Sequence, residues 1–107
     1  MKGYLVSFFT VEAATYKHKH VTDWMLDLTK RLKLRGVTVI RAAEGFGAHG
    51  RLHSARFFEL ADQPVEIVLA VSDDECERLF AELQKETIHL FYVKSEVEFG
   101  TINGRPQ

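Results

Sequence analysis

Glycines, histidines and an arginine are concentrated in one stretch near the middle of the 107-residue chain. Residues 45–53 contain three glycines (Gly45, Gly47 and Gly50) and, among and after them, Phe46, His49, Arg51 and His53. Glycine permits positive φ and the close approach of a ligand, and arginine binds carboxylate or phosphate through a fork of donors. A hairpin that only reverses the chain needs about two to five residues. We therefore predict that residues 45–53 form a loop and that this loop is the binding site.

The same residues also have purely structural interpretations. The triplet 45–47 could form a β-bulge in which its phenylalanine packs, and Arg51 could pair with an acidic residue of a neighbouring subunit. His49 and His53 could contact a ligand, bind a metal ion or transfer protons, or they could only hold the loop through hydrogen bonds. The residues alone leave both interpretations open.

Three further candidates lie outside that segment. His18 and His20 would share one face of a strand and could chelate a divalent ion, or they are solvated residues of a lysine-flanked turn. Cys76, the only cysteine, lies on an apolar helical stripe, so we interpret it as a core residue rather than a nucleophile. With one cysteine, the chain has no disulfide framework and no cysteine-rich zinc site.

Composition indicates a single domain over residues 1–107. Lysine and arginine total 14 against 15 acidic residues, which gives a net charge of −1. A nucleic-acid-binding protein normally has a basic balance or a basic stripe, so we expect no nucleic-acid partner. No apolar run approaches the ~20 residues of a membrane-spanning helix. We expect a cytoplasmic protein, because an unpaired cysteine fits a reducing compartment.

Two segments have the periodicity of amphipathic helices. Apolar residues at positions 21, 24, 25, 28 and 32 predict a first helix, which Gly36 would end in the left-handed conformation. Ser72 and Glu75 predict a capping box at the start of a second helix. The apolar stripe of that helix consists of Cys76, Leu79, Phe80 and Leu83.

Strand-forming residues predict strands over 4–11, 37–43 and 88–93, with an extension at 96–99. A further strand begins near residue 56 and resumes over 65–71 after Pro64, which marks an edge, a bulge or a turn. The order β-α-β-β-α-β predicts an α+β, ferredoxin-like sandwich: one antiparallel four-stranded sheet with two helices on one face. The other face would remain uncovered, and a large exposed apolar face predicts self-association.

Motifs along nearly the whole chain resemble a bacterial PII-like family of unknown function, which is related to the PII nitrogen-regulatory signalling proteins. The motifs are Gly36-Val37-Thr38-Val39, Glu44-Gly45-Phe46-Gly47, Gly50-Arg51-Leu52-His53-Ser54-Ala55-Arg56, Asp62-Gln63-Pro64-Val65, Phe91-Tyr92-Val93-Lys94 and Val97-Glu98-Phe99-Gly100. The ordered set carries the resemblance, rather than any single motif.

The resemblance implies a homotrimer that binds a small anionic ligand in the clefts between its subunits. In PII proteins, the backbone after a G-F-G motif at the base of a mobile loop helps to bind nucleotide phosphates. The ligand-binding candidates are therefore Glu44, Gly45, Phe46, Gly47, Ala48, His49, Arg51 and His53. The resemblance also implies that a partner protein, a membrane transporter or an enzyme, recognises the loop over residues 44–54.

Two departures from the PII pattern restrict the expected ligand. Ala48 and His49 stand where PII proteins have arginine and glutamine. Residues 85–89 contain no glycine, whereas PII proteins have a second, glycine-rich and lysine-containing phosphate loop there. These departures weaken the expectation of triphosphate binding and of a magnesium-bridged 2-oxoglutarate site. A nucleoside monophosphate or diphosphate remains compatible.

Three functions remain open at this point. The first is a non-enzymatic regulator with a nucleotide effector and no resident cofactor, which changes the order of the 44–54 loop. The second is a metal-binding trimer, in which histidines meet across subunits: His18, His20, His49, His53 and His89. The third is a small enzyme with His53 or His49 as general base. We rank the regulator first and predict no catalytic residue, because no nucleophile, base and orienting group occur together.

Overall fold

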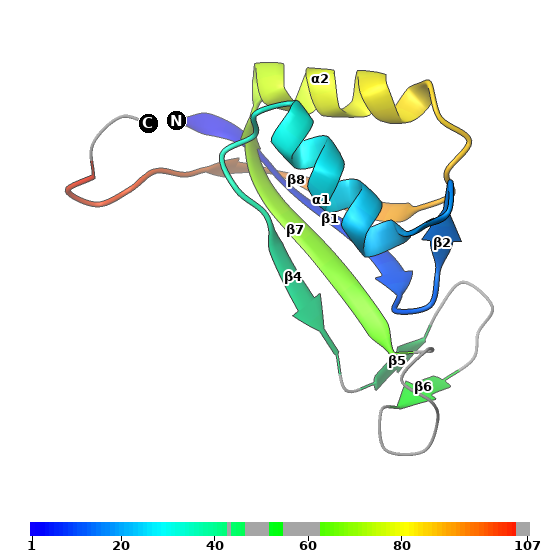
Figure 1. The fold of residues 1–107 in the computed structure, drawn as a ribbon. Coiled ribbons are helices and arrows are strands. Elements are labelled where there is room, and N and C mark those ends of the chain that lie inside the picture. Colours follow the sequence, from blue (N-terminus) through cyan, green and yellow to red (C-terminus); the bar gives the residue numbers. More distant parts are fainter. Residues whose placement is uncertain (43, 47–51, 55–62, 105–107) are drawn as a thin grey trace.

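A computed structural model describes residues 1–42, 44–46, 52–54 and 63–104, and for residues 44–46 and 52–54 it describes the backbone. The main sheet is antiparallel and has the strand order β4-β7-β1-β8. Its strands are β1 (Lys2–Val11), β4 (Thr38–Arg41), β7 (Pro64–Ser72) and β8 (Phe91–Glu98). The helices α1 (Val21–Arg31) and α2 (Asp73–Gln84) lie on one face of this sheet (Figure 1). The ferredoxin-like α+β architecture predicted from the sequence is therefore confirmed.

The hydrophobic core lies between the sheet and the two helices. Alternate residues of a strand point to the same face, and those that face the helices are apolar and buried along β7 and in the middle of β1. The buried apolar residues are Val6, Phe8, Val65, Ile67, Leu69 and Val71 from the sheet, and Val21, Met25, Leu28, Cys76 and Leu79 from the helices. Burial raises the pKa of the Cys76 thiol, so the thiolate is disfavoured and the interpretation of Cys76 as a core residue is confirmed.

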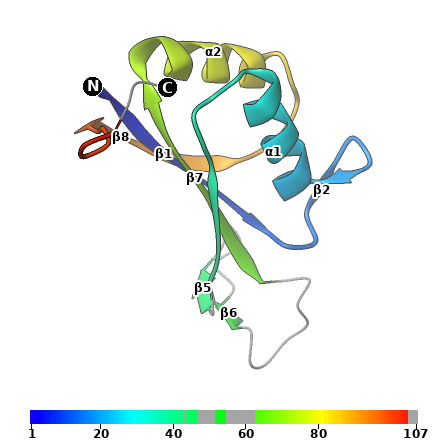
Figure 2. The same cartoon turned by 60° about the vertical axis from the view of Figure 1, so that its left-hand side comes forward.

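The face of the sheet opposite the helices, here called the open face, retains large exposed apolar side chains. Strand alternation and cross-strand pairing assign five of them to it, with exposed fractions between 38% and 67%: Leu5, Phe9, Ile40, Phe91 and Val93. Phe9 pairs with Phe91, and their ring centroids are 5.8 Å apart. Figure 2 shows both helices on the other side of the sheet. The prediction of an incompletely covered face therefore agrees with the structure.

The start of α2 agrees with the sequence. The Ser72 hydroxyl accepts a hydrogen bond from the Glu75 amide (3.3 Å), and the Ser72 amide donates to the Glu75 carboxylate (2.7 Å). This is the predicted capping box. Arg35 also donates to the Glu75 carboxylate (3.2 Å), which ties the segment after α1 to the first turn of α2.

The predicted end of α1 at Gly36 is wrong. The helix ends at Arg31, and Lys33 rather than a glycine adopts the left-handed conformation, with φ of 57°. The amide of Leu34 donates to the carbonyl of Thr29 (3.0 Å), and that of Lys33 donates to the carbonyl of Lys30 (3.0 Å). These two bonds define a Schellman motif, which Leu34 completes by packing against the core.

Residues 15–20, for which the sequence predicted no strand, form a small hairpin. Strands β2 (Thr15–Tyr16) and β3 (Lys19–His20) pair through a two-residue turn in which Lys17 and His18 both have positive φ (50° and 67°). Such turns usually contain asparagine or glycine, and this one contains neither, so it was not predicted. The Tyr16 ring packs edge-on against Trp24 at 5.1 Å, and this contact helps to hold the hairpin against α1.

The remaining differences concern element ends. Strand β1 begins at Lys2 rather than residue 4, and β8 forms one continuous strand from Phe91 rather than beginning at residue 88. Pro64 is the first residue of β7, a position where its missing amide donor is tolerated. The start of a strand near residue 56 lies outside the described residues. In the described part of the chain, no helix is long and apolar enough to cross a membrane.

Candidate functional site

The two ends of the glycine-rich segment pair with each other. Strand β5 (Glu44–Phe46) and strand β6 (Leu52–Ser54) form an antiparallel ladder, in which Glu44 pairs with Ser54, Gly45 with His53 and Phe46 with Leu52. This hairpin lies at the end of the sheet away from the two chain termini (Figures 1 and 2). The prediction of a loop over the whole of residues 45–53 is therefore wrong at both ends.

The hairpin positions some of the predicted ligand-binding residues. Gly45 and His53 lie directly opposite each other in the ladder, between the pair formed by Glu44 and that formed by Phe46. Gly47, Ala48, His49 and Arg51 lie outside the described residues. The assignment of this set to ligand binding therefore stays a prediction.

An ion pair lies where this segment leaves the main sheet. The Arg41 guanidinium, at the end of β4, donates two hydrogen bonds to the Glu12 carboxylate, at 2.8 Å and 3.1 Å. The Nδ1 atom of His20, next to the first residue of α1, is 3.0 Å from the Glu12 carbonyl oxygen. Two-point arginine–carboxylate contacts fix orientation as well as distance. The pair therefore joins strand ends that are not neighbours in the sheet.

The pair shifts the ionisation of both partners in the direction that favours the charged forms. The hydrogen bond from Arg41 lowers the pKa of the Glu12 carboxyl, burial opposes that shift, and the charge of Arg41 adds to the lowering. The same hydrogen bond raises the pKa of Arg41. With 47% and 33% of the two side chains exposed, the interaction is screened by solvent and is worth about 1 kcal/mol or less.

Backbone hydrogen bonds hold both ends of segment 43–62. The Ala42 amide donates to the Pro64 carbonyl (2.9 Å), and the Glu12 amide donates to the Gln63 carbonyl (2.9 Å). The chain therefore leaves and re-enters the sheet at fixed positions, next to the Arg41–Glu12 pair.

Sequence reasoning missed Glu12 and Arg41. Glu12 directly follows the predicted strand 4–11, and Arg41 lies near the end of the predicted strand 37–43. Alternation assigns both to the face that carries the helices. However, β4 and β1 are separated by β7 in the sheet. The charges of Glu12 and Arg41 near strand ends were the available signal. Predicting that these two residues form an ion pair also requires the order of the strands in the sheet.

The connection between α2 and β8, where PII proteins have their second phosphate loop, is held by a carboxylate. Glu86 accepts a hydrogen bond from the Tyr16 hydroxyl (2.7 Å) and pairs with the Lys17 ammonium (2.7 Å). The Thr87 amide donates to the Tyr16 hydroxyl oxygen (3.0 Å). The bonds from Lys17 and Tyr16 lower the pKa of Glu86. The Lys17 ammonium and the Tyr16 hydroxyl, which lie beside this connection, thus bind the Glu86 carboxylate of the same chain.

Two hollows in the described surface lie away from the hairpin. One of about 390 Å³ adjoins the start of α2 and is lined by Lys2, Gly3, Tyr4, Asp73, Glu96, Val97 and Glu98. Its three carboxylates disfavour an anionic ligand. The other, of about 140 Å³ and mainly apolar, lies between the end of α2 and β8 and includes Phe80 and Tyr92. Neither hollow corresponds to the predicted site.

The histidines within the described side chains do not form a metal centre. His18 occupies the turn of the β2–β3 hairpin, whereas the His20 ring contacts the Glu12 carbonyl. Among described residues, no group of three or more histidine, cysteine, aspartate or glutamate side chains is arranged to hold a metal ion. The described residues therefore give the metal-binding alternative no support.

Comparison with known proteins places the chain in a family. The model of DUF190, described as "Uncharacterized ACR, COG1993", matches residues 3–99. The chain belongs to the DUF190 family. A UPF0166 protein from Aquifex aeolicus (strain VF5) is 26% identical over 85 residues, which are 78% of the DUF190 chain and 81% of the relative.

Solved structures share the fold of this DUF190 chain. CPII from Thiomonas intermedia K12, a nitrogen regulatory PII-like protein described as bound to ADP, AMP and bicarbonate, superimposes with a TM-score of 0.65 and 18% identity. The match covers 94% of this chain and 97% of CPII. A structure from Thermus thermophilus, also named as PII-like, gives a TM-score of 0.65 with 20% identity over 91% of this chain and 88% of its own. The DUF190 chain therefore has a PII-like fold.

Proposed function

We propose that this DUF190 chain is a non-enzymatic, PII-like regulatory protein. Three copies assemble through their sheets and bind a small anionic effector in the clefts between subunits. The segment 44–54 then changes its order with the effector, and a partner protein, a membrane transporter or an enzyme, recognises that change. This is a population shift between two states of one segment.

The open face is the observation that carries the proposal. Phe91 and Val93 are 67% and 50% exposed, and they adjoin Phe9 and Leu5 of β1 on the same face. Ile40 of β4 lies on that face too, with Glu66 of β7 between it and Phe9. Large exposed apolar patches are typical of interaction sites. Burial of apolar surface contributes about 25 cal/mol per Å², so contact between such faces favours assembly. The number of three copies comes from the resemblance to PII proteins.

The identity of the effector is inferred from two observations. CPII, which shares the fold, is described as bound to ADP, AMP and bicarbonate. In the DUF190 chain, the Glu86 carboxylate engages Lys17 and Tyr16 at the connection that carries phosphate contacts in PII proteins. That arrangement supports a ligand with fewer phosphates than ATP. AMP, ADP and bicarbonate are therefore the first effectors to test.

Thermal unfolding with a panel of ligands tests the proposal. The purified protein is heated with AMP, ADP, ATP or bicarbonate at matched ionic strength, with sodium chloride as the reference. We expect AMP, ADP or bicarbonate to raise Tm. A ligand present at a hundredfold excess over its Kd stabilises the folded state by about 2.7 kcal/mol.

Variants connect the response to the predicted site. Gly47→Val should abolish the Tm rise because the added side chain obstructs the backbone amides, and Arg51→Ala should weaken it by removing a fork of donors. Arg78→Ala is the matched control, because Arg78 lies on α2 and donates to the Leu32 carbonyl (2.8 Å). An unchanged Tm across the whole ligand panel contradicts the effector-binding proposal.

A further inference from the structure

Two donors of the β2–β3 hairpin converge on one carboxylate oxygen. The Tyr16 hydroxyl and the Lys17 ammonium both lie 2.7 Å from Oε1 of Glu86, which belongs to the connection between α2 and β8. The Glu86 side chain is only 18% exposed, whereas the Lys17 side chain is 62% exposed. Solvent therefore reaches the ammonium directly, and so can a small anion.

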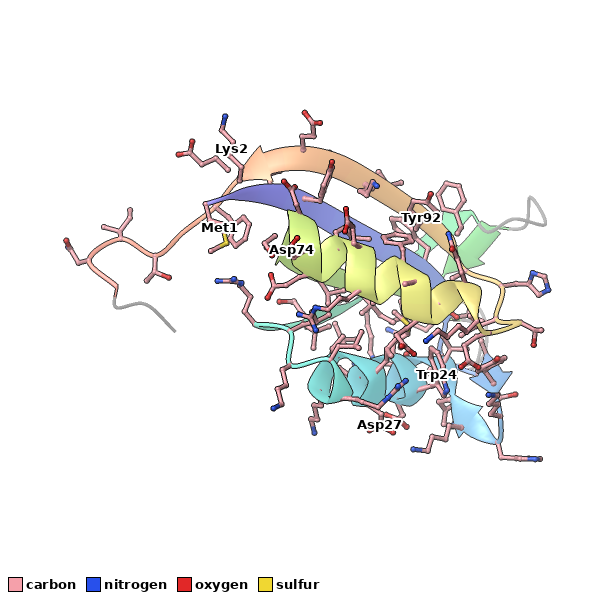
Figure 3. All side chains as sticks on the ribbon, turned by 90° about the horizontal axis from the view of Figure 1, so that it is seen from above. Met1, Lys2, Trp24, Asp27, Asp74 and Tyr92 are labelled. Carbon is pink, nitrogen blue, oxygen red and sulfur yellow. The ribbon has the colours of Figure 1, made fainter. Side chains whose placement is uncertain are left out.

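The Tyr16 hydroxyl is oriented by its other contacts. Its oxygen accepts a hydrogen bond from the Thr87 amide (3.0 Å), so its hydrogen is available to donate to Glu86. The ring packs edge-on against Trp24, with centroids 5.1 Å apart. Figure 3, seen from above, shows Trp24 beside the hairpin at the start of α1. These contacts fix the direction in which the hydroxyl donates.

Lys17 occupies a backbone position that is uncommon for lysine. It is the first of the two turn residues of the hairpin and has a φ of 50°. Positive φ is uncommon outside glycine, and asparagine and glycine are the usual residues of such turns. Residues with unusual backbone conformations cluster at ligand-binding sites and switch regions. The backbone of Lys17 therefore favours a role for its ammonium at this position.

The surroundings of Glu86 favour a bound anion. Hydrogen bonds from Lys17 and Tyr16 lower the pKa of the Glu86 carboxyl, and burial opposes this shift. The charges of Lys17 and Arg31 add to the lowering. These groups therefore hold Glu86 as a carboxylate at neutral pH. Hydrogen bonds to a charged group are about twice as strong as neutral ones, so another oxyanion would also satisfy these donors.

We propose that Lys17 and Tyr16 form an anion subsite, which the Glu86 carboxylate fills when no ligand is bound. A small oxyanion, such as phosphate or a carboxylate, displaces Glu86 and accepts the same two hydrogen bonds. Solvent screens a partly exposed ion pair and makes it weak, so an anion of higher charge can compete. Glu86 is thus an internal competitor, which limits the affinity of the subsite for external anions.

The hairpin connects the subsite with the base of segment 43–62. The His20 ring, at the end of β3, is 3.0 Å from the Glu12 carbonyl oxygen, and Glu12 pairs with Arg41. An anion at Lys17 would therefore act beside the segment that the proposed effector reorders, and this regulatory role rests on the proposed function. The subsite itself is complete within one chain and requires no cleft between subunits.

Titration with inorganic phosphate tests the competition. The backbone amide resonance of Thr87, which donates to the Tyr16 hydroxyl, reports binding by NMR, and sodium chloride keeps the ionic strength constant. The titrated proteins are the wild type, Glu86→Gln, Lys17→Met and the double variant Glu86→Gln/Lys17→Met. Glu86→Gln keeps the size of the side chain and removes its charge, so it should lower the Kd of phosphate about fivefold. Lys17→Met should abolish binding in both backgrounds.

Glu82→Gln is the matched control. It removes the same charge from α2, where the Glu82 carboxylate pairs with Arg31 and Lys85, and it should change the Kd of phosphate by less than about twofold. Tyr16→Phe keeps the aromatic ring and removes the hydroxyl, so it should raise the Kd about threefold. Sodium acetate replaces phosphate in a second series, and the anion whose binding depends on Lys17 identifies the ligand class.

The outcomes separate this inference from the regulatory proposal. Anion binding that persists in Lys17→Met would overturn the inference, and so would a Glu86→Gln variant that binds no more tightly than Glu82→Gln. A wild type that binds neither anion also overturns it. Far-UV circular dichroism checks the fold of each variant. Phosphate binding that depends on Lys17, together with an unchanged Tm in AMP and ADP, would contradict only the regulatory proposal.

Discussion

Arg41 and Glu12 form two hydrogen bonds across the end of β7, with Nε–Oε2 and Nη2–Oε1 distances of 2.8 Å and 3.1 Å. They come from β4 and from the residue after β1, which are not adjacent in the sheet. Together with the Ala42–Pro64 backbone bond (2.9 Å), the pair fixes the base of the segment that carries the predicted ligand-binding residues. These contacts thus hold the base of the candidate site against the main sheet.

A double-mutant cycle with Glu12→Gln and Arg41→Gln measures this pair. We expect a coupling free energy of about 0.5–1 kcal/mol by urea unfolding, at the upper end for a surface pair because the contact has two hydrogen bonds. The Lys19–Asp27 pair is the control, because both of its side chains are 55% exposed. A coupling at Arg41–Glu12 no larger than at Lys19–Asp27 would refute the structural role of the pair.

The contribution of Glu12 should disappear in acid. Its pKa is lower in the folded protein than the ordinary value of 4.5, so the folded state favours the carboxylate. The stabilisation is therefore complete above the unfolded pKa and is lost as pH falls through the folded pKa. The difference in unfolding free energy between wild type and Glu12→Gln should be full near pH 7 and should shrink once pH falls below about 4.5. A difference that is constant over this range would show that the ionised pair is not its cause.

Two buried threonines of α1 should respond oppositely to the same substitution. The Thr22 hydroxyl has no hydrogen-bond partner within the described structure, whereas the Thr29 hydroxyl donates to the Leu26 carbonyl (2.8 Å). An unsatisfied buried polar group costs about 1–3 kcal/mol. Thr22→Val should therefore leave Tm unchanged or raise it, and Thr29→Val should lower stability by about 0.5–1.5 kcal/mol. The opposite order in thermal unfolding would contradict these environments.

Two glycines should also differ in their tolerance of alanine. A Cβ atom at Gly3 would overlap the Val71 carbonyl oxygen and lie 2.8 Å from the Ser72 Cα. At Gly36, no atom of the described residues lies within 4 Å of the position that a Cβ atom would take. Because the obstacle at Gly3 is backbone, Gly3→Ala should destabilise the protein by about 2–3 kcal/mol. Gly36→Ala should be neutral or stabilise it by up to about 1 kcal/mol. Equal Tm values for the two variants would contradict the close strand packing at Gly3.

The sequence predicted features whose signal is local. Ser72 and Glu75 are three positions apart, and the capping box that they form depends on that spacing alone. The stripe that includes Cys76 and Leu79 likewise identified the buried side of α2. The fold class followed from the order of such elements.

Features that depend on distant residues were missed. Lys33 adopts the left-handed conformation because Leu34 packs against the core and completes the Schellman motif, so no glycine was needed at the end of α1. The β2–β3 hairpin has no turn signature, yet Glu86, 70 residues after Tyr16 in the sequence, binds both Tyr16 and Lys17. The Arg41–Glu12 pair was missed for the same reason. The end of α1, the β2–β3 hairpin and this ion pair all depend on contacts between residues that are distant in the sequence.

The mass of the protein in solution tests the regulatory proposal most directly. Sedimentation equilibrium of the purified chain, over a range of concentrations, determines how many 12.3-kDa chains associate. The proposed trimer, whose number of copies comes from the resemblance to PII proteins, predicts a number divisible by three, with the clefts between subunits that an effector requires. A stable single chain would contradict the proposal, because no cleft between subunits would then exist.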